Sequence, residues 1–185
     1  PQSLAADGSA LWTAGGVALA PGVSPDFYFS SGATADGTGG VIVGLSAQNS
    51  VTAQRLSPSG VRLWGASGVL VHPPTSTYSE GAKTVAADGS GGGVFVWRAS
   101  NDAEALYAQR IDANGTLQWG PAGIAISPST AAKWTPSIVA DGAGGTVVGW
   151  REYAHGFGLR FLVQRLPGDG AAPSGTNGAS AHPSS

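Results

Sequence analysis

The chain has 185 residues, of which 42% are hydrophobic and only 11% are charged, and its net charge is −2. This composition is typical of a folded globular domain and excludes a disordered chain, and it provides no basic field for nucleic acid or anionic lipid. Cysteine and methionine are absent, which excludes disulfides, thiol catalysis and cysteine-based metal sites and favours an extracellular or cell-surface location.

No apolar run approaches the roughly 18 residues of a membrane span, so no membrane insertion is expected. The sequence begins without Met or a signal peptide and is interpreted as a mature form or a fragment. Thirty glycines and twelve prolines, together with many Val, Thr and Trp residues, favour short strands joined by tight turns.

Three sequence markers recur with one period. Glycine-rich turns of the form Asp-Gly-x-Gly-Gly occupy residues 36–40, 88–92 and 141–145. Gln-Arg pairs occur at 54/55, 109/110 and 164/165, and tryptophans at 12, 64 and 119. All three markers return at nearly the same interval, which indicates an internal repeat in the size range of propeller blades.

Each repeat is predicted to hold four strands in a constant order. A Leu-x-Trp strand that continues into an apolar run comes first, as at 63–71 and 117–126, and a short strand such as 136–140 follows after a variable loop. The Asp-Gly turn then leads into an apolar strand, and a Gln-Arg strand such as 106–111 ends the unit. The predicted units are 1–56, 57–111 and 112–166, followed by a tail rich in Pro, Gly and Ser at 167–185, read as linker or disordered.

Two segments carry a resemblance to a known repeat. Residues 107–120 read Tyr-Ala-Gln-Arg-Ile-Asp-Ala-Asn-Gly-Thr-Leu-Gln-Trp-Gly, and residues 138–145 read Ile-Val-Ala-Asp-Gly-Ala-Gly-Gly. They resemble a repeat common in bacterial secreted and surface proteins. The resemblance covers residues 1–170 and implies a β-propeller; most such proteins lack an assigned activity, and no catalytic residues are implied.

We therefore expect an all-β fold of three four-stranded, propeller-type blades of about 53 residues each. Three blades do not close an ordinary ring, since four is the usual minimum. Three outcomes follow: two chains form one six-bladed ring, the chain belongs to a longer propeller, or the three units form a β-trefoil.

A structural role is predicted for the hairpin that follows each Gln-Arg pair. Simple antiparallel register places Arg55 opposite Trp64, where a cation–π contact is worth roughly 0.5–2 kcal/mol; in the alternative, Trp only packs and Arg extends to water. The six residues of this predicted interlock are Trp12, Arg55, Trp64, Arg110, Trp119 and Arg165. Because Trp12 has no Arg before it and Arg165 no Trp after it, we expect Trp12 beside Arg165, in the same ring or in a neighbouring chain.

The variable loops share one rim of the predicted blades and are the candidate binding surface. Exposed aromatic side chains beside polar ones suit a glycan or a surface protein, or they cover the rim of the core. The candidate rim residues are Tyr28, His72, Tyr78, Arg98, Trp134, Arg151, Tyr153 and His155. Trp97 and Trp150 end apolar strands and are expected in the core.

No catalytic, metal or cofactor site is predicted. The aspartates of the glycine-rich turns are explained by turn chemistry, the three histidines share no ligand spacing, and Glu80, Glu104 and Glu152 lie in different loops. We expect a non-catalytic structural or assembly module of a secreted bacterial protein, which builds a propeller by strand exchange with other chains or further repeats. The alternative is a carbohydrate- or protein-binding module, lectin-like or adhesive, that uses the variable rim.

Overall fold

The computed structural model describes residues 1–20, 28–47, 50–72, 79–99, 105–127, 129–154, 156, 158–170 and 179–180, with the backbone alone at 28–31, 47, 79–83, 135, 154 and 179–180. Over these ranges the chain is all-β, with twelve strands and no helix. The search of the same ranges for a helix long and apolar enough to cross a membrane found none.

The strands form three antiparallel sheets of four, as the repeat predicted. The first sheet contains β1 (Tyr28–Ala35), β2 (Val41–Ala47), β3 (Ser50–Leu56) and β4 (Val69–His72). The second contains β5 (Ser79–Ala87), β6 (Gly93–Ala99), β7 (Ala105–Ile111) and β8 (Ile124–Ala125). The third contains β9 (Ala132–Ala140), β10 (Thr146–Ala154), β11 (Gly158–Leu166) and β12 (Ala179–Ser180). Each sheet follows sequence order from one edge to the other.

The glycine-rich turn between the first two strands of each sheet is held by its aspartate. Asp36 Oδ1 accepts hydrogen bonds from the amides of Thr38 and Gly40, each at 2.8 Å. Gly37 and Gly39 have φ of 82° and 90°, a backbone conformation that residues with a Cβ rarely adopt. The same aspartate-to-amide bonds recur in the turns at 88–92 and 141–145. The turn chemistry therefore explains why the pattern repeats.

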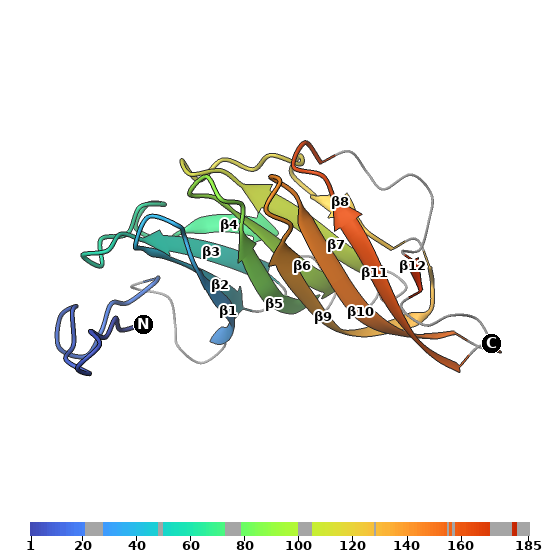
Figure 1. The fold of residues 1–185 in the computed structure, drawn as a ribbon, viewed down its shortest axis with the longest axis horizontal. Coiled ribbons are helices and arrows are strands. Elements are labelled where there is room, and N and C mark those ends of the chain that lie inside the picture. The colour runs from blue at the N-terminus through green and yellow to red at the C-terminus, as the bar shows by residue number, and fades with distance from the viewer. Residues whose placement is uncertain are drawn as a thin grey trace.

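The sheets lie in a row, with the second between the first and the third (Figure 1). A buried cluster that includes Val51 and Ala53 of β3 and Phe95 and Trp97 of β6 joins the first two sheets. A second cluster joins the other two sheets, and its members include Leu106, Ala108, Trp119, Val148, Trp150 and Leu162. Trp97 and Trp150 are 0% and 3% exposed, so their predicted place in the core is confirmed.

The boundaries of the sheets differ from the predicted units. In each of the first two sheets the fourth strand follows the Gln-Arg strand and pairs with it, so the Gly-Val run ends one sheet instead of opening the next. The sheets consequently span 28–72, 79–125 and 132–180. Backbone pairing decides this, because the hairpin after the Gln-Arg strand returns the chain alongside the same strand.

The interpretation of the whole tail at 167–185 as linker or disordered was wrong, because residues 179–180 form a strand. β12 pairs with β11 through Leu162↔Ser180 and Val163↔Ala179. These β11 positions lie one repeat after Tyr107 and Ala108, which pair with β8. The tail therefore supplies the fourth strand at the position that β8 occupies in the second sheet.

The strand pairings lie within the three sheets. Among the described residues, no strand of one sheet pairs with a strand of another sheet. A β-trefoil, in which the three units share one barrel, requires such pairings. The N-terminal segment lies beside the first sheet, and the third sheet lies at the opposite end of the row (Figure 1). The arrangement within one chain is a linear stack of three sheets.

Candidate interaction site

A buried glutamine ties each of the first two Gln-Arg strands to the segment that follows its hairpin. Gln54 is fully buried, and its Nε2 donates to the Gly65 carbonyl at 2.9 Å while its Oε1 accepts from the Trp64 amide at 3.1 Å. Gln109 repeats both bonds in the second sheet. Because an unpaired buried amide is costly, these bonds fix where the tryptophan sits.

The hairpin register corrects the predicted Arg–Trp pairing by one residue. The Leu63 amide donates to the Arg55 carbonyl at 2.8 Å, and the second hairpin has the equivalent bond. Trp64, one residue later, lies across from Gln54, whose side chain holds its amide. The expectation that each arginine faces its tryptophan directly was therefore wrong, because the buried glutamine occupies that place.

The arginine of each Gln-Arg pair binds the aspartate of the glycine-rich turn in its own sheet. Arg55 Nε lies 2.8 Å from Asp36 Oδ2, and its Nη2 donates to the Thr38 hydroxyl at 3.2 Å. The pairs Arg110–Asp88 and Arg165–Asp141 repeat this bond. The three aspartates thus order their turns and also orient an arginine, a role that the sequence did not reveal.

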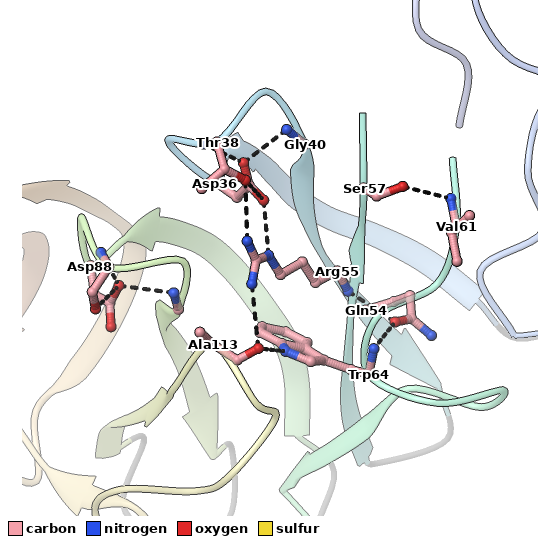
Figure 2. A network of polar contacts seen from close by, with 12 residues as sticks. Asp36, Thr38, Gly40, Gln54, Arg55, Ser57, Val61, Trp64, Asp88 and Ala113 are labelled. Carbon is pink, nitrogen blue, oxygen red and sulfur yellow. Dashed lines mark hydrogen bonds and ion pairs between the residues drawn. The ribbon is translucent and has the colours of Figure 1, made fainter. Parts of the chain in front are cut away.

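Arg55 and Trp64 meet at one acceptor in the next sheet. Arg55 Nη1 donates to the Ala113 carbonyl at 3.3 Å, and Trp64 Nε1 donates to the same oxygen at 3.1 Å. Ala113 lies in the hairpin turn at 112–115, which follows β7 (Figure 2). We call this contact, in which a hairpin turn of one sheet accepts from Arg and Trp of the preceding sheet, the sheet junction.

The sheet junction recurs along the row with one of its two hydrogen bonds missing at each end. Arg110 Nη1 donates to the carbonyl of Gly168, which lies one repeat after Ala113. Before the first sheet, Trp12 Nε1 donates to the Pro58 carbonyl at 2.8 Å. Trp119 packs against the third hairpin turn, but its buried Nε1 has no hydrogen-bond partner. Three hairpin turns in succession therefore receive the preceding tryptophan.

A glycine at the end of each hairpin turn admits the indole ring. Gly115 has φ of 87°, and a Cβ placed there would lie 3.1 Å from Trp64 Cδ1. Gly60 and Gly170 are packed in the same way against Trp12 and Trp119. Both the backbone conformation and the closeness of the ring therefore require glycine in this position.

The aspartates of the junction are held ionised. Burial raises the pKa of Asp36, but hydrogen bonds from Thr38, Arg55 and Gly40 outweigh it, so that the pKa is lowered overall. The same balance lowers the pKa of Asp88, which is bonded to Ser90, Arg110 and Gly92. At neutral pH the junctions of Arg55 and Arg110 therefore each contain a carboxylate and a guanidinium in contact.

The Arg–Asp ion pair of the third sheet is open to solvent. The side chains of Arg55 and Asp36 are 11% and 0% exposed, whereas those of Arg165 and Asp141 are 55% and 10% exposed. The difference arises because no hairpin turn among the described residues lies over Arg165, as the turn carrying Ala113 lies over Arg55. The ion pair itself is still formed.

The outer face of β11 is exposed where the equivalent faces of β3 and β7 are buried. Val51 and Leu106 are both fully buried, but Phe161, one repeat after Leu106, is 43% exposed. Ala108 is fully buried, but Val163 is 37% exposed. The large hydrophobic residues exposed on the third sheet are Trp134, Val139, Tyr153, Leu159, Phe161 and Val163.

The predicted Trp12–Arg165 contact is not formed within this chain. Trp12 is bonded to Pro58 beside the first sheet, and Arg165 is bonded to Asp141 in the third. These sheets are separated by the second sheet in the row (Figure 1). The version of the prediction that places both residues in one chain was therefore wrong.

Two of the candidate rim residues lie between sheets. His72 stacks on Trp97 at a centroid distance of 5.2 Å, and burial lowers its pKa. Arg98 is 9% exposed, and its Nη1 donates to the Lys133 carbonyl at 3.2 Å. Both side chains therefore contribute to packing between neighbouring sheets.

Three other rim residues share the outer face of the third sheet. Trp134 and Arg151 are directly paired in register, and Tyr153 lies two residues further along β10. Trp134 is 37% and Tyr153 is 48% exposed. The side chain of Tyr28, and the whole of Tyr78 and His155, fall outside the described residues.

A row of charged residues crosses the inner face of the third sheet, and the sequence did not reveal it. Lys133, Glu152 and Arg160 are neighbours in register on β9, β10 and β11, and the first two are fully buried. Arg160 binds Glu152 at 2.5 Å, and Lys133 Nζ donates to two backbone carbonyls. Each charge in the row therefore has a polar partner, as buried charges require.

The described part of the chain contains no group of three or more His, Cys, Asp or Glu residues placed to hold a metal ion. The chain matches no protein-family model, and comparison with curated proteins gives no significant match. The feature best supported by the geometry is thus the sheet junction, repeated between neighbouring sheets and left open at the third.

Proposed function

We propose that the chain is a non-catalytic assembly module of a secreted bacterial protein, which adds further sheets of the same kind to its third sheet and so builds a β-propeller. Its repeat resembles that of bacterial surface and secreted proteins, and the absence of cysteine and methionine favours a location outside the cell. Cell fractionation with an antibody to the chain tests that location.

One observation carries the proposal. Each of the first two sheets presents an apolar face and an Arg–Asp pair to the following sheet, and both are covered there. On the third sheet the same positions are more exposed: Val163 is 37% exposed, and the side chain of Arg165 in the ion pair is 55% exposed. Exposed apolar faces of this kind mark protein interfaces. Because a following sheet covers the equivalent positions of the first two sheets, an additional sheet of the same kind is the partner that fits this face.

The number of sheets supports assembly between chains. Closed propellers have typically four to eight blades, and the described part of one chain provides three sheets. Two copies provide six. A ring of six sheets would place a junction at every boundary and would leave neither end of the row exposed.

A charge placed on the outer face tests the proposal. Val163→Glu puts a carboxylate on the exposed face of β11, and we expect it to abolish self-association measured by sedimentation velocity. Val61→Glu is the matched control, because Val61 is 59% exposed and belongs to the hairpin of the first sheet. Equal association of both variants and the unsubstituted chain would contradict the proposal.

A second candidate function is recognition of a glycan or surface protein on the same face. The exposed aromatic rings of Trp134 and Tyr153 flank Arg151, an arrangement that suits stacking on a sugar beside a hydrogen-bond donor. A glycan array with Trp134→Ala as control tests it. Binding that is lost in Trp134→Ala, by a chain that stays monomeric, would favour this candidate over assembly.

A further inference from the structure

We propose that residues 1–20 form an intramolecular cap on the first sheet, and that the third sheet of a second copy of this chain competes with the cap for the same face. The inference rests on the proposed assembly function and adds to it the partner face and its control. In the docked pair, Arg165 of one copy donates to the Pro58 carbonyl of the other.

The internal interfaces define the register in which one sheet covers the next. Between the first two sheets, Val51 and Ala53 of β3 share a buried cluster with Phe95 and Trp97 of β6. Arg55, on the same strand β3, reaches the hairpin turn of that following sheet. The second and third sheets meet in the same way one repeat later. An interface in this register therefore joins an outer strand to a middle strand and a hairpin turn.

The third sheet provides the outer-strand side of such an interface. Phe161 and Val163 of β11 occupy the two positions that are buried on β3, and they are 43% and 37% exposed. The side chain of Arg165, two residues further along, is 55% exposed. The apolar residues and the guanidinium that the first sheet presents to the second are thus accessible here.

The first sheet provides the other side. Val43 and Leu45 of β2 lie one repeat before the two β6 residues of the internal cluster. Pro58, in the hairpin turn after β3, lies one repeat before Ala113. When β11 packs on Val43 and Leu45 as β3 packs on β6, the same register brings Arg165 to the Pro58 carbonyl.

In the single chain the cap occupies this place. Trp12 Nε1 donates to the Pro58 carbonyl at 2.8 Å, as the tryptophan of the first sheet donates to the next turn. A Cβ at Gly60 would meet Trp12 and Val17, and the equivalent tryptophan and valine surround the glycine of the next turn. The cap therefore lies on the first sheet in the register of a preceding sheet, where the third sheet of a second copy would dock.

The cap complements the face less completely than a sheet does. Ser3 stands at the position of Arg55, because its carbonyl accepts from the Leu11 amide as that of Arg55 accepts in the next hairpin. The cap therefore brings no guanidinium to the junction. A hollow of about 620 Å³ is lined by residues of both the cap and β2. A docked third sheet supplies an arginine and two large apolar side chains at this place.

Because cap and second copy occupy the same place, the first sheet binds a second copy only in chains whose cap has left it. The apparent affinity is reduced by the fraction of chains in that state. A substitution that weakens the cap is consequently expected to strengthen self-association, although it removes contacts from the single chain.

Weakening the cap in the full chain tests this competition. Trp12→Ala removes the indole and its hydrogen bond to Pro58, and the dissociation constant measured by sedimentation velocity is expected to fall on the order of tenfold. Leu11→Ala is the matched control, because Leu11 is adjacent and 59% exposed, and it is expected to leave the affinity unchanged. Circular dichroism of each variant verifies that the sheets stay folded.

The direction of the change decides the outcome. An unchanged dissociation constant for Trp12→Ala would overturn the cap. A higher one would also overturn it, because Trp12 would then belong to the interface itself. An equal gain in Leu11→Ala would contradict the role given to the indole.

A cross-link tests the register of the docked pair. Thr38 and Ala113 belong to neighbouring sheets, and both are bonded to the guanidinium of Arg55. Their equivalents in the docked pair are Ala143 of one copy and Pro58 of the other. Because the chain has no cysteine, a thiol introduced near either position reacts alone.

In the experiment, a protein carrying Ala143→Cys and one carrying Ser59→Cys, next to Pro58, are mixed and treated with a short bis-maleimide. A cross-linked pair is expected from the mixture. The matched control replaces Ala143→Cys by Ser90→Cys, at the same exposed position of the preceding glycine-rich turn. It is expected to give no product, because Arg110 beside that turn already binds a hairpin turn of its own chain.

The outcomes separate the inference from the proposed function. Self-association without this cross-linked product would overturn the docking of the third sheet on the first and leave the assembly function intact. Absence of self-association in every variant would overturn both.

Discussion

Arg55 and Ala113 are separated by 58 positions in sequence, and the guanidinium of one donates to the carbonyl of the other at 3.3 Å. The bond joins the first sheet to the second, and Trp64 donates to the same carbonyl. Neighbouring sheets are thus fixed to one another by a polar contact as well as by their apolar faces. This contact makes the stacking testable residue by residue.

The hydrogen bond from the indole is tested by comparing two tryptophans. Trp64→Phe removes a donor that has an acceptor, so we expect a loss of about 1 kcal/mol in the free energy of unfolding. Trp119→Phe removes an Nε1 without a partner and is expected to cost less. Urea denaturation followed by circular dichroism measures both, and equal losses would contradict the role of the Ala113 carbonyl.

The buried glutamine is tested against its half-buried counterpart in the third sheet. Gln54→Ala leaves the Trp64 amide and the Gly65 carbonyl without their partner, and we expect a loss of about 2 kcal/mol in unfolding free energy. In the third sheet, Gln164 donates to the exposed Arg165 carbonyl, so Gln164→Ala is expected to be nearly neutral. A larger loss for Gln164→Ala, measured in the same way, would refute this account of the hairpin.

Replacing the glycine beside the indole by alanine is expected to lower the stability of the fold. Gly115→Ala combines a positive φ with contact against Trp64, whereas Gly142→Ala has a positive φ of 74° and open space around it. The left-handed conformation alone costs roughly 1–2 kcal/mol, so Gly142→Ala is expected to lose about that much. Gly115→Ala is expected to lose more, and thermal unfolding of both variants gives the comparison.

The ion pairs make the fold sensitive to acid. The pKa of Asp36 and of Asp88 is lower in the folded chain than the unfolded value of about 3.9, because their hydrogen bonds outweigh the opposing effect of burial. The stability that they contribute is therefore present above about pH 4 and is lost as the pH falls through the folded value. Between about pH 5 and about pH 2, the unfolding free energy of Asp36→Asn is expected to decrease less than that of the unsubstituted chain.

The matched control for this titration is Asp141→Asn, in which the affected arginine is already 55% exposed. It is expected to reduce stability at neutral pH less than Asp36→Asn does, since breaking a buried pair costs about 3–5 kcal/mol and exposed pairs contribute little. An acid profile of Asp36→Asn that matches the unsubstituted chain would show that this carboxylate does not govern acid unfolding.

The period of the sequence markers predicted the class of fold because turns and strands depend on local chemistry. The Asp-Gly-x-Gly-Gly turns could be identified because the aspartate side chain accepts hydrogen bonds from amides of its own turn. The division into units could not, because only pairing with the Gln-Arg strand assigns the Gly-Val run to the preceding sheet. β12 was missed for the same reason, since a two-residue strand has no pattern of its own.

The interaction site was predicted in its members and not in its contacts. Arg55 and Trp64 were identified by their spacing, but the shared acceptor is a backbone carbonyl in another sheet, and no sequence pattern marks a carbonyl. The one-residue difference in register followed from the buried side chain of Gln54. Long-range contacts of this kind depend on how whole sheets pack, which local patterns do not specify.

The mass of the chain in solution tests the central claim most directly. One chain has a mass of 18.3 kDa. Multi-angle light scattering over a concentration series is expected to show a mass that rises to a plateau at twice that value, as two chains combine into six sheets. A mass that stays at 18.3 kDa at every concentration would contradict assembly through the third sheet.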